Sequence, residues 1–182
     1  MSRTLILMRH GEAAAPAGTS DHERPLTDRG TEQAAAAGAW IAESLPPVRA
    51  VLCSTSLRTR QTLDAVADGA TRFDASSAGI LSAAPEASFA HALYGAAPEG
   101  VLGEIALTDA DAPTLLVIGH FPGLPETALA LDPAGPRSAE VRRGLPAAGC
   151  IVLRSDTPWD TFPDALRGAA TPFAGIRRVR TP

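Results

Sequence analysis

The chain has 182 residues, of which 45% are hydrophobic and only 4% aromatic. This length predicts a single domain over residues 1–182, with a core made mostly of aliphatic residues and alanine. The net charge of −4 argues against a general nucleic-acid-binding protein, because such a protein would show a basic face. All sixteen basic residues are arginine, so any cation that binds phosphate must be arginine or histidine, and a mechanism through a lysine Schiff base is excluded.

Cysteine usage and hydropathy point to a protein without disulfides or membrane spans. Cys53 and Cys150 are too few for a disulfide framework, and neither shows the spacing of metal ligands. The N-terminal apolar run is too short for a signal peptide, and no stretch is as long as a membrane span. We therefore expect a soluble, cytoplasmic protein that needs no metal or cofactor.

The first buried strand is expected at residues 5–8, which are four large apolar residues in a row. Arg9, His10 and Gly11 follow it, and polar groups of this kind should lie where the strand leaves the core. In open α/β sheets, ligands bind at this carboxyl end of the strands. A histidine beside a guanidinium suits a nucleophile that attacks phosphorus, and Gly11 would let the backbone approach a ligand. Alone, the tripeptide is a weak motif, and His10 could be an ordinary residue at a strand end.

A helix and a second strand follow. Thr27-Asp28 supplies an N-cap for a helix over residues 29–45, which two prolines end. Residues 48–53 form the next apolar run. This β-α-β pattern predicts that the strands at 5–8 and 48–53 form a parallel pair with a right-handed connection.

Residues 54–68 predict a helix that brings an arginine to the same edge of the sheet. Ser54 or Ser56 would cap this helix and place Arg58 in its first turn, where a helix N-terminus favours anions. Arg60 lies on a different face. The alternative is that Arg58 is a solvated surface arginine.

A further strand is predicted at 114–118, and Gly119 and His120 end it as Gly11 and His10 end the first strand. Elsewhere we expect a loosely patterned segment over 69–97 with a short helix at 89–94, in which His91 is structural or exposed. The remaining expected elements are helices at 98–107 and 124–131, a polar connection at 132–143, turns or helix at 159–167, and strands at 149–154 and 175–180.

Three strand ends thus bring two arginines and two imidazoles to one edge of one sheet. Arginine donates paired hydrogen bonds that match phosphate, so the set predicts a pocket for a compact dianion. A Walker-type glycine loop and a carboxylate cluster for magnesium are both missing from the sequence. The pattern therefore predicts phosphoryl transfer without a metal.

Three motifs carry a resemblance to a known family. The segment Leu7-Met8-Arg9-His10-Gly11-Glu12-Ala13 resembles the signature of the histidine phosphatase superfamily, the phosphoglycerate mutase-like proteins. Ser54-x-x-x-Arg58-x-x-Gln61-Thr62 is similar to the second arginine motif, and Val117-Ile118-Gly119-His120 to the second-histidine motif. The resemblance implies an α/β fold, a three-layer α/β/α sandwich with a mostly parallel central sheet. It also implies a phosphorylated His10 intermediate in a phosphate pocket made by Arg9, Arg58 and His120.

Within this superfamily, the small size and the segment Ser20-Asp21-x-x-Arg24-Pro25-Leu26-Thr27 look most like the SixA-type phosphohistidine phosphatases. The long insertion that carries the general acid of the mutases is missing. By resemblance, Asp21 is the best candidate for a general acid, and Arg24 is expected to help bind the substrate. Alternatively, Asp21 is a surface aspartate that pairs with Arg24, and Glu12 and Glu23 are weaker candidates. Phe121 departs from the many relatives that carry asparagine after the second histidine.

Three functions are compatible with these residues. The first is hydrolysis of phosphohistidine in a protein, through an intermediate on His10. The second is hydrolysis of small phosphomonoesters such as sugar phosphates. The third is a regulatory module that binds phosphate without catalysis. The oligomeric state does not follow from the sequence.

Overall fold

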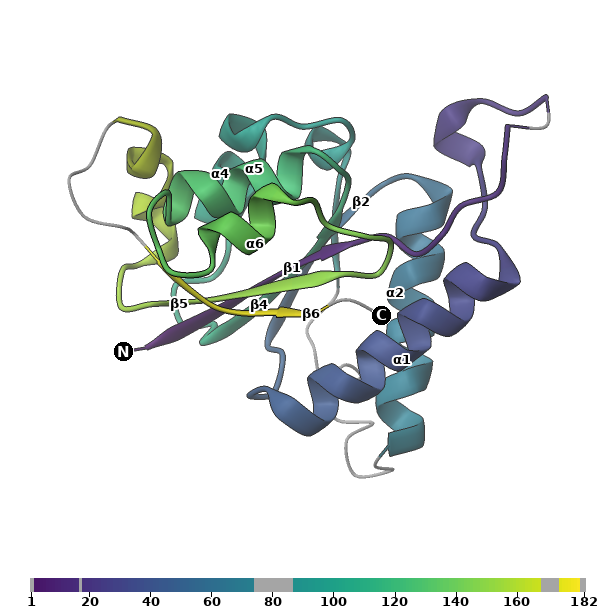
Figure 1. Cartoon of the computed structure of the whole chain (residues 1–182), viewed down its shortest axis with the longest axis horizontal. Helices are drawn as coiled ribbons and strands as arrows, with labels where there is room; N and C mark the ends of the chain where they lie inside the picture. The colour runs from purple at the N-terminus through teal and green to yellow at the C-terminus, as the bar shows by residue number, and fades with distance from the viewer. Residues whose placement is uncertain (1, 17, 74–86, 168–173, 181–182) are drawn as a thin grey trace.

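The computed structural model describes residues 2–16, 18–73, 87–167 and 174–180. Within this part of the chain, a six-stranded sheet with the order β3-β2-β4-β1-β5-β6 lies between two layers of helices (Figure 1). The strands are β1 (Arg3–Arg9), β2 (Ala50–Ser54), β3 (Ser88–Ala90), β4 (Thr114–Gly119), β5 (Cys150–Ser155) and β6 (Gly175–Arg180). The α-helices are α1 (Asp28–Ser44), α2 (Leu57–Phe73), α4 (Pro98–Ala106), α5 (Gly123–Leu131) and α6 (Ser138–Arg142). The described residues also form the 3₁₀ segments η1 (Asp21–Glu23), η3 (His91–Leu93) and η4 (Trp159–Arg167).

The predicted three-layer α/β/α architecture is confirmed by the way β1 fills two separate cores. Successive side chains of a strand point to opposite faces of the sheet. Leu5 and Leu7 pack in the core beneath α4 and α5, whereas Ile6 and Met8 pack in the core beneath α1 and α2. All four side chains are buried. Figure 1 shows the two helical layers on opposite sides of the sheet.

The expected pairing of the first two strands is wrong, because β4 lies between them. Strands β1 and β2 each form a parallel pair with β4, and β5 forms an antiparallel pair with β1. All six residues of β4 are buried, so this strand suits the centre of the sheet, with a hydrogen-bonded neighbour on each side. As a result, the carboxyl ends of β1, β4 and β2 lie next to one another.

Helix α1 begins where its sequence predicts. The hydroxyl of Thr27 accepts a hydrogen bond from the backbone N–H of Gly30 at 2.9 Å, as an N-cap does. Helices α1 and α2 approach each other closely at two glycines, one on each helix. A Cβ added to Gly38 would collide with the carbonyl oxygen of Val66, and one on Gly69 with that of Ala35.

Two segments differ from their predictions. The helix expected at 89–94 is instead the strand β3 followed by η3, because Phe89 pairs with Cys53 along the free edge of β2. The polar connection expected at 132–143 contains the short helix α6, which is held by a buried hydrogen bond from Ser138 to the carbonyl of Asp132. Helix α2 extends beyond its expected end to Phe73, and residues 74–86 of the loosely patterned segment lie outside the described residues.

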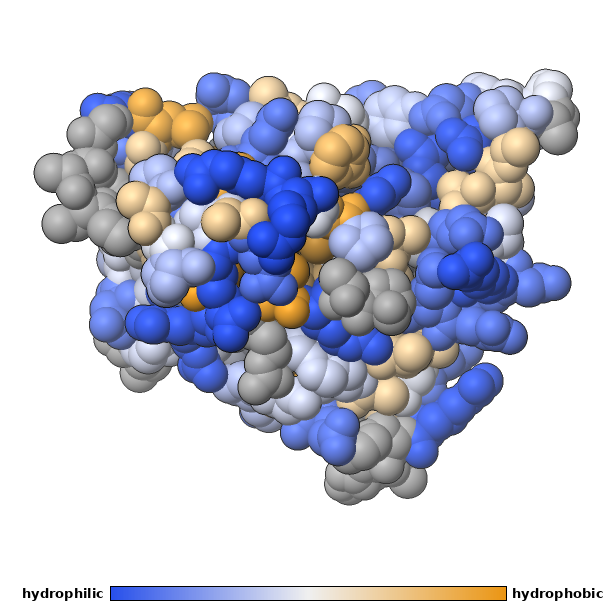
Figure 2. Space-filling view, viewed as in Figure 1, coloured by the Kyte–Doolittle hydropathy of each residue, from blue (hydrophilic) through white to orange (hydrophobic). Residues whose placement is uncertain are grey.

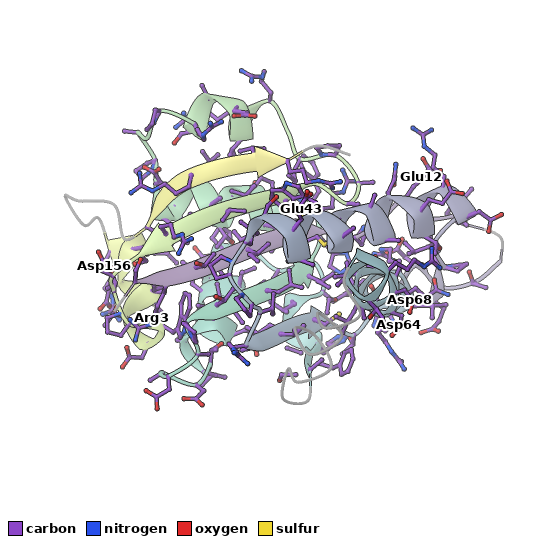
Figure 3. All side chains as sticks on the ribbon, turned by 90° about the horizontal axis from the view of Figure 1, so that it is seen from below. Arg3, Glu12, Glu43, Asp64, Asp68 and Asp156 are labelled. Carbon is purple, nitrogen blue, oxygen red and sulfur yellow. The ribbon has the colours of Figure 1, made fainter. Side chains whose placement is uncertain are left out.

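The described helices include none that is long and apolar enough to cross a membrane. The face in Figure 2 is largely hydrophilic, with hydrophobic residues in small separate areas. In Figure 3, Arg3 and Asp156 lie at one end of the sheet and Glu12 at the opposite end, where the carboxyl ends of β1, β2 and β4 meet.

Candidate active site

His10 follows β1 directly and is held as a neutral base. Its backbone N–H donates to the carbonyl of Gly119 at 3.1 Å, which ties the end of β1 to the end of β4. Its Nδ1 lies 2.7 Å from the carbonyl oxygen of Gly11. A carbonyl oxygen only accepts hydrogen bonds, so Nδ1 carries the proton and Nε2 has a free lone pair. Burial, with smaller contributions from Arg58 and Arg9, lowers the pKa of His10 to about 4.

Gly11 is required by a close approach to helix α1. An added Cβ would collide with the carbonyl of Gly30, and the approach of a ligand to Gly11 stays a prediction. The N–H of Gly11 donates to the hydroxyl of Thr62, which itself donates to the carbonyl of Arg58. The turn after His10 is therefore attached to both α1 and α2.

Arg58 lies in the first turn of α2, as predicted, and is only 6% exposed. Its guanidinium donates to the carbonyl of Asp21 at 2.5 Å and to the carboxylate of the same residue at 3.0 Å. Its Nη2 also lies 3.4 Å from Nδ1 of His120. The alternative of a solvated surface arginine does not fit this burial.

His120 follows β4 and faces His10, with 5.3 Å between the ring centroids. Because the guanidinium of Arg58 can only donate, Nδ1 of His120 accepts and Nε2 carries the proton. Nε2 lies 2.9 Å from the hydroxyl of Ser54, a residue that the sequence predicts as a possible helix cap and as the first position of the second arginine motif. Burial, followed by the charges of His10 and Arg58, lowers the pKa of His120 to about 3.

Arg9 reaches the same pocket from the end of β1. Its guanidinium donates to the carbonyl of Leu145 at 2.8 Å and lies 5.4 Å from the centre of the Phe121 ring. Its buried Nε has no hydrogen-bond partner among the described residues. Burial lowers the pKa of Arg9.

Asp21 is surrounded by donors. Its carboxylate accepts hydrogen bonds from the Tyr94 hydroxyl at 2.6 Å, from Arg24 at 2.7 Å and from Arg58 at 3.0 Å. Tyr94 and Arg24 are the main reasons that the pKa of Asp21 is well below its usual range. These donors stabilise the charged carboxylate, and the role of Asp21 as a general acid stays a prediction.

The other predicted acids and Arg24 are not among the residues that line the pocket. Arg24 pairs with Asp21 and donates to the carbonyl of Ala14, and it does not line the pocket itself. Glu12 accepts a hydrogen bond from Thr27 at the start of α1 (Figure 3). Glu23 pairs with His22 at 2.9 Å.

Tyr94 is a pocket residue that sequence reasoning missed. It is the only tyrosine of the chain, and its ring meets three of the four histidines. The ring centroids are 5.3 Å from His120, 5.0 Å from His22 and 5.9 Å from His91. His91 is exposed, one of the two alternatives predicted for it. No local pattern marks Tyr94, because only the pairing of β3 with β2 brings it to this edge.

These side chains surround one open pocket of about 280 Å³. Its lining residues are Arg9, His10, Asp21, Arg58, Tyr94, Gly95, His120 and Phe121. The described part of the chain holds no group of three or more His, Cys, Asp or Glu residues placed to bind a metal ion. The pocket instead combines two guanidiniums with an imidazole whose Nε2 is free to attack.

Comparison with known proteins assigns the class. The family model of the histidine phosphatase superfamily (branch 1) matches residues 5–76. An uncharacterised protein of Mycobacterium tuberculosis is 40% identical over 156 residues, which cover 84% of this chain and 89% of that protein. The chain belongs to the histidine phosphatase superfamily and is a phosphatase.

Within the superfamily, the chain is similar to SixA proteins. The phosphohistidine phosphatase SixA of Escherichia coli is 34% identical over 123 residues, which cover 65% of this chain and 67% of that enzyme. The solved structure of a SixA protein from Nakamurella multipartitia has a TM-score of 0.79 and 34% identity, and the match covers 100% of this chain and 97% of that one. A second SixA structure, from Agrobacterium tumefaciens, has a TM-score of 0.75 at 22% identity and so shows the shared fold.

Proposed function

We propose that this phosphatase hydrolyses phosphohistidine in a protein, without a metal, through a phosphoryl group carried on His10. Nε2 of His10 attacks the phosphorus, the bond from phosphorus to the substrate imidazole breaks, and the leaving nitrogen takes up a proton. Water then attacks the phosphorus on His10 and releases inorganic phosphate, which returns the imidazole to its starting state. The low pKa of His10 supports the first step because it keeps Nε2 unprotonated at neutral pH.

The proposed phosphate-binding residues are Arg9, Arg58 and His120. Both guanidiniums and His120 line the pocket, and Ser54 holds the ring of His120 through Nε2 at 2.9 Å. Charge-assisted hydrogen bonds of this kind each contribute about 1.5–3 kcal/mol. Three or four of them supply the charge neutralisation for which many phosphoryl-transfer enzymes use magnesium.

The hydrogen bonds to Asp21 favour phosphohistidine over a phosphate ester. An alkoxide leaving group needs a proton donor, but Tyr94, Arg24 and Arg58 all donate to this carboxylate and stabilise its charged form. An imidazole leaving group protonates readily and needs little help. The similarity to SixA proteins supports the same substrate class. A cytoplasmic location and a single domain over the whole chain stay predictions.

A rapid-quench experiment tests the intermediate. Wild-type enzyme mixed with a ³²P-labelled phosphohistidine protein should yield an acid-labile, base-stable phosphoenzyme, and His10→Ala should yield none while unfolding at a similar urea concentration. Label on another residue, or substantial turnover by a folded His10→Ala variant, would show that the assignment of His10 is wrong.

A substrate panel tests the function. With a phosphohistidine protein and a sugar phosphate at equal concentration, we expect kcat/KM to be higher for the protein by at least about tenfold. Addition of EDTA should leave turnover unchanged, and vanadate should inhibit it. Efficient turnover of the sugar phosphate alone would favour the small-ester function instead.

A further inference from the structure

Two exposed phenylalanines lie close to the pocket. Among the described residues, the large hydrophobic side chains that are exposed are Phe89, Leu107, Phe121 and Leu166. Both phenylalanines are 51% exposed. Phe121 lines the pocket, and Phe89 lies on β3 next to the carboxyl end of β2. Exposed aromatic rings beside an active site mark a candidate contact surface.

The surface between the two rings is continuous. Phe89, Arg60 and Thr55 line a second, shallow hollow. The hydroxyl of Thr55 lies 3.1 Å from Nδ1 of His91, and the ring of His91 stacks on Tyr94 with 25° between the planes. Tyr94 lines the catalytic pocket, which extends on its other side to Phe121.

Each phenylalanine has an arginine guanidinium over its ring. The guanidinium of Arg9 lies 5.4 Å from the ring centre of Phe121, and that of Arg60 lies 5.8 Å from the ring centre of Phe89. A cation over an aromatic face is attractive and orients both side chains. Each pair therefore presents an apolar ring next to a guanidinium, a combination that suits the side chains and carbonyls of a polypeptide.

We propose that the surface formed by Phe121, Tyr94, His91, Arg60 and Phe89, called here the docking strip, binds the polypeptide that carries the phosphohistidine. This inference rests on the proposed function. The pocket itself has room for the phosphoryl group and the ring that carries it. Residues next to the phosphohistidine must then lie on the surface around the mouth, and the docking strip is the aromatic surface that continues from it. A small phosphate ester would fill the pocket without reaching Phe89.

The test compares Phe89→Ser with Leu107→Ser. Leu107 is 80% exposed and lies at the end of α4, near the start of β2 and away from the pocket. The measured quantity is kcat/KM for a phosphohistidine protein divided by kcat/KM for p-nitrophenyl phosphate. We expect Phe89→Ser to lower this ratio by about tenfold, mainly through a higher KM for the protein, and Phe89→Leu to restore part of it. Leu107→Ser should leave the ratio within twofold of wild type.

Different results would contradict the docking strip and the proposed function. Turnover of the phosphohistidine protein by wild type, with the same ratio in Phe89→Ser and Leu107→Ser, would overturn the docking strip alone. Inactivity of wild type on that protein, with retained activity on p-nitrophenyl phosphate, would overturn the proposed function and this inference with it. Because Phe89 is half exposed, we expect its serine variant to fold, and a thermal unfolding curve checks this.

Discussion

His10 and Arg58 are positioned by contacts that a short motif does not show. The free lone pair of His10 depends on the carbonyl of Gly11, and Arg58 is held by Asp21, which lies 37 residues earlier in the chain. Sequence reasoning found both side chains because each follows a buried strand that ends at one edge of the sheet. It did not find Ser54 or Tyr94 as pocket partners, because their contacts depend on how distant strands pair.

Replacement of Arg58 tests whether it binds the transferring phosphoryl group. A guanidinium in this role can be worth roughly 10³-fold in rate, so Arg58→Ala should lower kcat/KM by about that factor. Arg58→Lys should also be poor, because lysine cannot form paired hydrogen bonds. Arg72, exposed in the last turn of the same helix, is the matched control, and Arg72→Ala should stay within about twofold. Steady-state kinetics with one substrate measure these effects. Similar kcat/KM values for Arg58→Ala and Arg72→Ala would contradict the role of Arg58 in binding the phosphoryl group.

At the scale of elements, long segments with strong patterns were predictable and short ones were not. Helix α1 has an N-cap, an apolar face and prolines after its end, and β4 is an uninterrupted apolar run. Strand β3 has only three residues, and its pairing with β2 decides its conformation. Helix α6 has five residues and depends on a buried tertiary hydrogen bond. Neither the pairing of β3 nor the hydrogen bond that holds α6 can be inferred from the local sequence.

Two glycine substitutions, one at the contact of α1 and α2 and one in α4, should have opposite effects on stability. Gly38→Ala would push a Cβ into the backbone carbonyl of Val66, so it should destabilise the protein by about 1–3 kcal/mol. Gly103, exposed within α4, has no atom near the position of an added Cβ. Gly103→Ala should stabilise the protein by about 0.5–1 kcal/mol, because alanine loses less backbone entropy in a helix. Urea unfolding measures both, and a Gly38→Ala variant as stable as wild type would contradict the packing described here.

At the scale of the whole molecule, the strand order could not be predicted from the sequence. Each strand was expected, but nothing local shows that β4 lies between β1 and β2. This order has a functional consequence, because it places His120 between His10 on one side and Arg58 on the other. The two imidazoles lie side by side, that of His120 buried and that of His10 half-buried, and they make the stability of the fold sensitive to acid.

Protonation of these two imidazoles should lower the stability of the folded protein in acid. The folded-state pKa is about 4 for His10 and about 3 for His120, against an ordinary value of 6.5. Between pH 6.5 and 4 the unfolded chain therefore binds protons that the folded protein does not, so the free energy of unfolding should fall as the pH falls. Each imidazole contributes a slope of up to about 1.4 kcal/mol per pH unit in this window. Protonation of Asp21 lowers the free energy of unfolding further only near pH 4 and below, because its pKa is lowered from 3.8. Urea unfolding at pH 7, 6, 5 and 4.5 should show the decline in wild type and a smaller one in His10→Asn/His120→Asn. Equal slopes in the two proteins would mean that these imidazoles are not held neutral by the fold.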